Sequence, residues 1–86
     1  VSHNLRVRVT NDINYDESFA SIFATYADEV DFRSVESAQA GMMTELRYDI
    51  TLKDHSKVAD FMEQMQVACG NNHVILTKMR GNSLGA

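Results

Sequence analysis

Two different spacings of hydrophobic and polar residues follow each other at the start of the chain. Residues 5–10, LRVRVT, place a hydrophobic side chain at every second position, which predicts a strand with one buried face. Residues 15–29 change to helical spacing, so this segment is predicted to be an amphipathic helix. Asn14 is a good N-cap residue, and Glu17 stands three positions later, as in a capping box.

Residues 30–39 predict a second strand with a break in its alternation. Val30 and Phe32 share one face, but Val35 falls on the opposite face. A shift of this kind is typical of a β-bulge, which we expect near residues 33–34. Val35 is then expected to be an outward hydrophobic residue on this strand.

The middle of the chain predicts a hairpin followed by a second helix. Residues 40–41, Ala-Gly, suit a hairpin turn, and residues 43–52, MTELRYDITL, alternate throughout. Asp54 or Ser56 is placed to cap the helix at its start, and Gly70 is placed to cap its end. The predicted inward stripe of this helix consists of Val58, Phe61, Met62, Met65 and Cys69.

A last strand over residues 73–79 completes the order β-α-β-β-α-β. Right-handed crossovers then predict an α+β fold, a ferredoxin-like sandwich whose four-stranded antiparallel sheet has the order 4-1-3-2 and carries two helices on one face. Residues 1–80 are expected to form a single domain of this ferredoxin-like fold. Residues 81–86 carry no pattern and are predicted to be a frayed tail.

Composition and charge narrow the classes of function. The chain has 86 residues and a net charge of −4, whereas nucleic-acid binding needs a basic stripe. Cys69 is the only cysteine, so no internal disulfide forms, as in a reducing compartment. His3, His55 and His73 lack the spacing of a zinc site. No nucleophile stands at a plausible spacing from a base, so we expect no enzyme activity, cofactor or metal centre.

The loop at residues 11–18, NDINYDES, is the best candidate site in the sequence. Its polar and acidic side chains offer oxygen ligands to a hard cation or a small ligand, although the EF-hand pattern is absent. The other interpretation is that the same residues cap and start the helix. The candidate ligand-binding residues are Asn11, Asp12, Asn14, Asp16 and Glu17.

Two long runs carry a family resemblance: ESFASIFATYADEVDFRSVES and MTELRYDITLKDHSKVADFMEQM. They resemble the C-terminal domain of an uncharacterised bacterial membrane-protein family, in which transmembrane helices precede a cytoplasmic ACT-like domain. A more remote similarity is to the C-terminal domain of MgtC-type membrane proteins. The resemblance implies a regulatory or assembly module on the cytoplasmic side of the inner membrane. ACT domains in general bind small molecules at the loop after the first strand, but residues 11–18 lack the glycine of amino-acid-binding members.

Three surfaces are candidates for contact with another chain: the edge strand, the hairpin tip and the outward arginines of the first and third strands. A chain of this size buries a modest core and gains from association, so we expect a homo-oligomer. The candidate interface residues are Arg6, Arg8, Val35, Met42, Met43 and Arg47.

With what the family resemblance implies, the expected function is that of a non-enzymatic regulatory or oligomerisation module of a bacterial membrane protein. The alternative is a free-standing cytoplasmic ferredoxin-like protein that binds a metal ion or small ligand at the acidic loop. No nucleic-acid partner is expected. The identity of any small-molecule ligand stays open.

Overall fold

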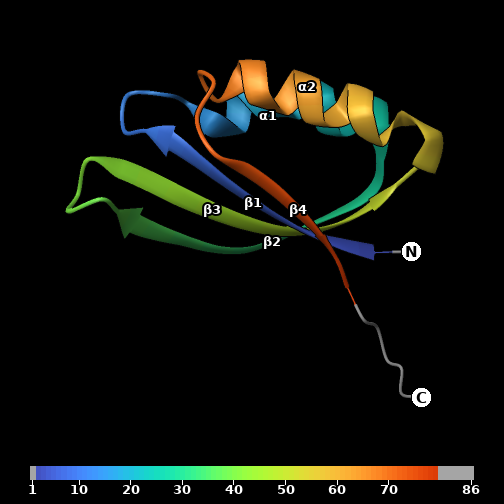
Figure 1. Ribbon diagram of the computed structural model, residues 1–86, viewed down its shortest axis with the longest axis horizontal. Coiled ribbons are helices and arrows are strands. Elements are labelled where there is room, and N and C mark those ends of the chain that lie inside the picture. The colour runs from blue at the N-terminus through green and yellow to red at the C-terminus, as the bar shows by residue number, and fades with distance from the viewer. Residues whose placement is uncertain (1, 80–86) are drawn as a thin grey trace.

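The computed structural model describes residues 2–79, which form one layer of helices on one antiparallel sheet (Figure 1). The sheet has the order β2-β3-β1-β4, which is the predicted order read from the other edge. A single turn of 3-10 helix, His55–Lys57, precedes the second helix. The predicted tail at 81–86 lies outside the described residues. The elements are β1 (Ser2–Thr10), α1 (Tyr15–Tyr26), β2 (Ala27–Ala38), β3 (Met43–Leu52), α2 (Val58–Ala68) and β4 (Val74–Lys78).

The predicted helix caps are present. The side-chain oxygen of Asn14 accepts the backbone N–H of Glu17, 3.3 Å away, at the start of α1. Asp54 caps the 3-10 turn by accepting the backbone N–H of Ser56. Gly70 follows α2 with a φ of +74°, a left-handed conformation that glycine adopts without strain. These local signals fix where both helical segments begin and where the second one ends.

Helix α1 ends at Tyr26, so its predicted extension to residue 29 is wrong. The backbone N–H of Lys53 donates to the Tyr26 carbonyl, and its ammonium group donates to the Ala24 carbonyl, each at 2.9 Å. Lys53 thus satisfies carbonyls that the helix end leaves free, and a cation suits the negative end of the helix dipole. Because Lys53 directly follows β3, a tertiary contact sets the boundary, and β2 begins at the next residue, Ala27.

Strand β2 shifts register against β3 between Phe32 and Ser34, which confirms the predicted bulge. The predicted position of Val35 on the outward face is wrong. One inserted residue moves every later side chain to the other face, and here it brings Val35 opposite Leu46. Leu46 belongs to the core between helices and sheet, so Val35 lies on the helix side of the sheet, as Phe32 does.

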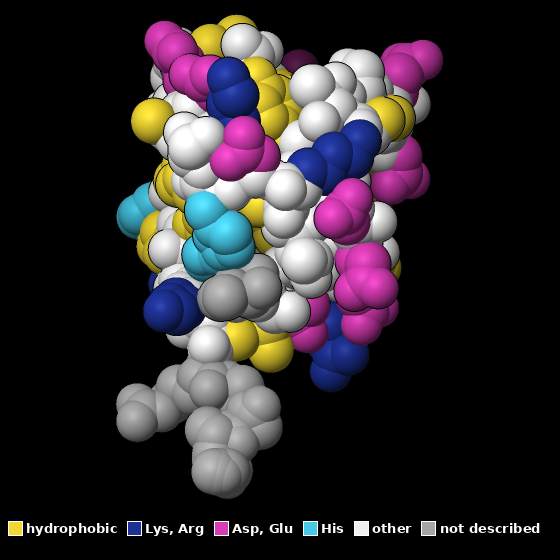
Figure 2. All heavy atoms as spheres, turned by 90° about the vertical axis from the view of Figure 1, so that its right-hand side faces the viewer, with side chains coloured by type: hydrophobic (Ala, Val, Ile, Leu, Met, Phe, Trp, Pro, Cys, Tyr) yellow, Lys and Arg dark blue, Asp and Glu magenta, His cyan; other side chains and the backbone are white. Residues whose placement is uncertain are grey.

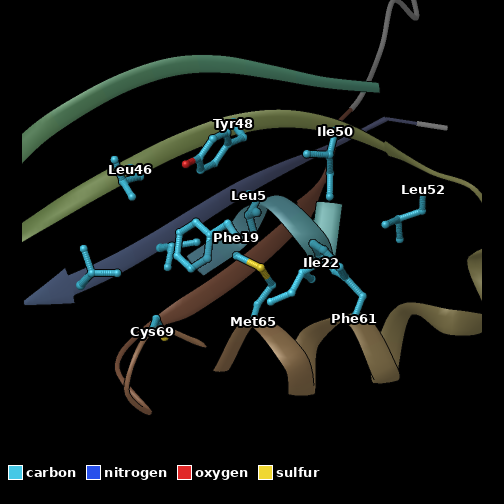
Figure 3. Packing of buried hydrophobic residues seen from close by; sticks show 12 residues of the cluster. Leu5, Phe19, Ile22, Leu46, Tyr48, Ile50, Leu52, Phe61, Met65 and Cys69 are labelled. Atoms are coloured by element: carbon cyan, nitrogen blue, oxygen red, sulfur yellow. The ribbon is translucent and has the colours of Figure 1, made fainter. Parts of the chain in front are cut away.

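The core lies between the two helices and one face of the sheet (Figure 3). Predicted stripe residues Phe61, Met65 and Cys69 of the second helical segment are fully buried. Phe23 of α1 is partly buried and stands at the centre of the aromatic packing. Its ring centroid lies 5.0 Å from that of Tyr48 and 6.5 Å from that of Phe61. The other large buried side chains are Leu5, Val7, Val9, Phe19, Leu46 and Ile50.

Phe23→Ala should lower the free energy of unfolding by about 3 kcal/mol, because the variant leaves a cavity between sheet and helices. Denaturant unfolding followed by circular dichroism measures this change. Val67→Ala is the control, since Val67 is 68% exposed on α2 and its truncation should cost less than about 0.5 kcal/mol. Equal midpoints for Phe23→Ala and the wild type would contradict the described core.

Candidate functional site

Asn11 and Asn14 of the candidate loop both have structural roles. The Asn11 side-chain amide donates to the carbonyl of Gly41 at 2.8 Å, and its oxygen accepts the hydroxyl of Thr44 at 2.7 Å. Asn11 therefore ties the loop after β1 to the turn of the β2–β3 hairpin. Asn14 uses its oxygen to cap α1. These contacts leave the loop's acids as its remaining candidate ligands.

The acids of this loop, Asp12, Asp16 and Glu17, are exposed to solvent. A hydrogen bond from the Thr10 side chain lowers the pKa of Asp12 below its usual value. Within residues 2–79, no three histidine, cysteine or acidic side chains gather in a way that could hold a metal ion. The structure therefore supports the helix-start interpretation of this loop, and ligand binding there stays a prediction.

The fold brings together two histidines that are distant in sequence. The ring centroids of His3 and His55 lie 5.8 Å apart. Figure 2 shows histidine side chains, in cyan, on the face of the molecule that it presents. The Nδ1 atom of His3 is buried without a hydrogen-bond partner among the described residues. Burial, followed by the charge of His55, lowers the pKa of His3. A pair of histidines lacks the further ligands that a zinc site needs.

On the sheet face away from the helices, Glu45 is held between two arginines. Its carboxylate lies 2.9 Å from Arg8 Nε and 2.9 Å from Arg47 Nη2, and only 5% of the residue is exposed. The hydrogen bond from Arg8 is the main cause of its lowered pKa. The pair with Arg8 joins β1 to β3, whereas Arg47 and Glu45 both belong to β3. Arg6, the third predicted arginine, lies opposite Arg47 on the same face.

An open polar hollow of about 450 Å³ lies beside this ion network. It is lined in part by Arg8, Gln66, Asn72 and His73. Gln66 donates to the carbonyl of Asn72, and the Asn72 side chain donates to the carbonyl of Cys69 at 2.8 Å. Because these groups bond to one another, they hold the loop between α2 and β4 in place.

The most exposed hydrophobic surface of the sheet lies on β2. Val30, Phe32 and Val35 are 40%, 50% and 49% exposed, and we call these three residues the β2 stripe. All three lie on the helix side of the sheet, opposite residues of the core. In the described part of the chain β2 pairs with β3 alone, so its other edge is open. Exposed hydrophobic groups beside open backbone groups favour contact with another polypeptide.

The sequence identified only part of this surface. Val35 was a candidate interface residue because it breaks the alternation of the strand. Val30 and Phe32 alternate like core residues, so the sequence did not indicate that they are exposed. At the hairpin tip Met42 is 71% exposed, but Met43, the first residue of β3, is buried. The tip therefore offers one methionine to a partner.

Comparison of the chain with models of protein families, with curated proteins and with solved structures found no match. Among residues 2–79, no helix is long and apolar enough to cross a membrane.

Glu45→Gln should lower the free energy of unfolding by about 1–2 kcal/mol at neutral pH, because it weakens three charge-assisted hydrogen bonds, one from Arg8 and two from Arg47, which are both partly exposed. The pKa of Glu45 lies below its usual value of 4.5, so its stabilisation is complete above that pH. It is lost as the pH falls through the folded-state pKa. The difference between variant and wild type should therefore shrink in acid.

Denaturant unfolding of both proteins across this pH range measures the effect. Glu63→Gln, at an exposed position of α2, is the control and should match the wild type. A difference for Glu45→Gln that is constant down to strong acid would contradict the assigned ion network.

Proposed function

We propose that this domain is a non-enzymatic regulatory or assembly module that binds another polypeptide at the open edge of β2. The observation that carries the proposal is the β2 stripe, three exposed hydrophobic side chains on a strand with one unpaired edge. Strand addition at such an edge supplies main-chain hydrogen bonds, and the neighbouring side chains supply selectivity.

A binding role is supported by how the reactive groups of the chain are used. Burial raises the pKa of the Cys69 thiol, which disfavours the nucleophilic thiolate. Glu45 is engaged by two arginines and is not placed as a general base. These groups serve the fold, whereas the β2 stripe is left 40–50% exposed in the described part of the chain.

The wider setting follows from the family resemblance and is part of the proposal. The order of the elements, with two helices on one sheet face, fits a ferredoxin-like, ACT-like plan. We propose that the domain is the cytoplasmic part of a bacterial membrane protein, on the inner side of that membrane. The polypeptide bound at β2 then belongs either to the same protein or to a regulatory partner.

Selection of displayed random peptides on the immobilised domain tests the binding role. Peptides that bind the wild type should lose most of their affinity for Val35→Lys, which places a charge in the β2 stripe. They should bind Val67→Lys unchanged, since this variant makes the same replacement at an exposed valine of α2. Selected peptides that bind both variants equally would place the binding surface elsewhere and refute the proposal.

A symmetric homo-oligomer that pairs through β2 is the second candidate. The observation that favours it is the same exposed stripe, which two copies would bury against each other. Sedimentation of the domain alone over a range of concentrations distinguishes the two candidates. Association that Val35→Lys abolishes and Val67→Lys leaves intact identifies a second copy as the occupant.

A further inference from the structure

The two faces of β2 differ in chemistry. The helix-side face carries the β2 stripe, and the opposite face carries three exposed acids, Glu29, Asp31 and Glu36. Arg33 is the only cation in the strand, and it already contacts Asp31 at 3.2 Å and Asp49 at 3.5 Å. A polypeptide added at this edge therefore meets hydrophobic side chains on one face and negative charge on the other.

This charge pattern disfavours a second copy of β2 as the occupant. The bulge fixes which residues of β2 share a face, so the possible antiparallel alignments follow from the register with β3. When Val30 of one copy faces Val35 of the other, Glu29 of the first copy lies opposite Glu36 of the second. When Phe32 lies opposite a valine, Asp31 lies opposite an acid as well. Like charges directly opposite across two strands destabilise the pairing.

The chain itself contains a strand that suits an acidic neighbour. In β1 the hydrophobic residues Leu5, Val7 and Val9 face the helices, while Arg6 and Arg8 face the other way. The pairing of β1 with β3 brings one of these arginines to the buried acid described above. A strand with the same alternation would find hydrophobic side chains on the helix side of β2 and acids on its other side.

We propose that the open edge of β2 binds an extended segment in which hydrophobic residues alternate with lysine or arginine. The inference rests on the proposed function and names the chemistry of the partner at that same surface. Three observations support it. The edge of β2 is unpaired, the β2 stripe lies on one face, and Glu29, Asp31 and Glu36, which we call the acidic row, lie on the other. The hydrophobic row supplies affinity and the acidic row selects the basic partner.

The probe is an end-blocked synthetic peptide of alternating valine and lysine, as long as β2, and its counterpart has glutamate in place of lysine. Fluorescence anisotropy with the domain measures both affinities. The lysine peptide should bind roughly tenfold or more tightly than the glutamate peptide, because opposite charges attract and like charges repel across paired strands. Equal affinities of the two peptides, or no binding of the lysine peptide, would overturn the inference.

Reversing one charge on β2 tests whether the peptide binds at this edge. Glu29→Lys should weaken binding of the lysine peptide roughly fivefold or more and strengthen binding of the glutamate peptide. Glu63→Lys makes the same change at an exposed position of α2 and should leave both affinities unchanged. Equal effects of the two variants would mean that net charge, and not the β2 edge, attracts the peptide, which refutes the inference.

The inference and the proposed function fail in different ways. If the displayed peptides bind at the β2 stripe but carry no basic residues, the binding module stands and the partner chemistry is wrong. If they bind elsewhere, the module itself is wrong. Association of the domain alone that depends on Val35 would identify a second copy as the occupant and overturn the inference.

Discussion

The mismatch in length between helix and strand decides what this protein exposes. A helix advances about 1.5 Å per residue and a strand about 3.3 Å, so twelve residues of each differ in length about twofold. Helix α1 and strand β2 both have 12 residues. The hairpin of β2 and β3 therefore extends beyond the helices that cover the sheet, as Figure 1 shows. On the helix side of β2 only Ala27, at the start of the strand, is buried, whereas the β2 stripe further along is left partly uncovered.

An aromatic chain connects the covered core with this uncovered strand. Tyr48 of the central strand β3 is almost fully buried, and burial raises the pKa of its hydroxyl. It contacts Phe23 on the helix side and Phe32 on the outer strand, with ring centroids 5.0 and 5.4 Å apart. Phe32 is thus exposed yet held in place by packing. A side chain that is already ordered loses less conformational entropy when a partner covers it.

The parts of the fold that local sequence determines could be predicted, and the parts set by distant contacts could not. Residues 43–52 formed the expected strand because their alternation matches a strand buried on one face. The end of α1 depends on Lys53, which no local signal near residue 26 identifies. The proximity of His3 and His55 likewise arises only when β1 pairs within the sheet and α2 covers it.

The β2 stripe also depends partly on local sequence and partly on distant contacts. The phase break predicted the bulge, but which face Val35 occupies after the bulge depends on its pairing with β3. Val30 and Phe32 have the pattern of core residues, and their exposure follows from how far the helices reach. A hydrophobic pattern therefore predicts which side of a strand faces the core layer. It does not predict whether that layer extends far enough to cover the strand.

Charge and hydrophobicity on β2 act over different ranges, which gives the two faces separate roles. The acidic row acts before contact, because salt at physiological concentration screens charges only beyond a distance of about 8 Å. It repels a second acidic edge and attracts a basic segment while both are still hydrated. The β2 stripe acts only in contact, when hydrophobic surface leaves water. Added salt weakens the first effect and spares the second, so the same edge loses selectivity in salt while it keeps its tendency to bury hydrophobic side chains.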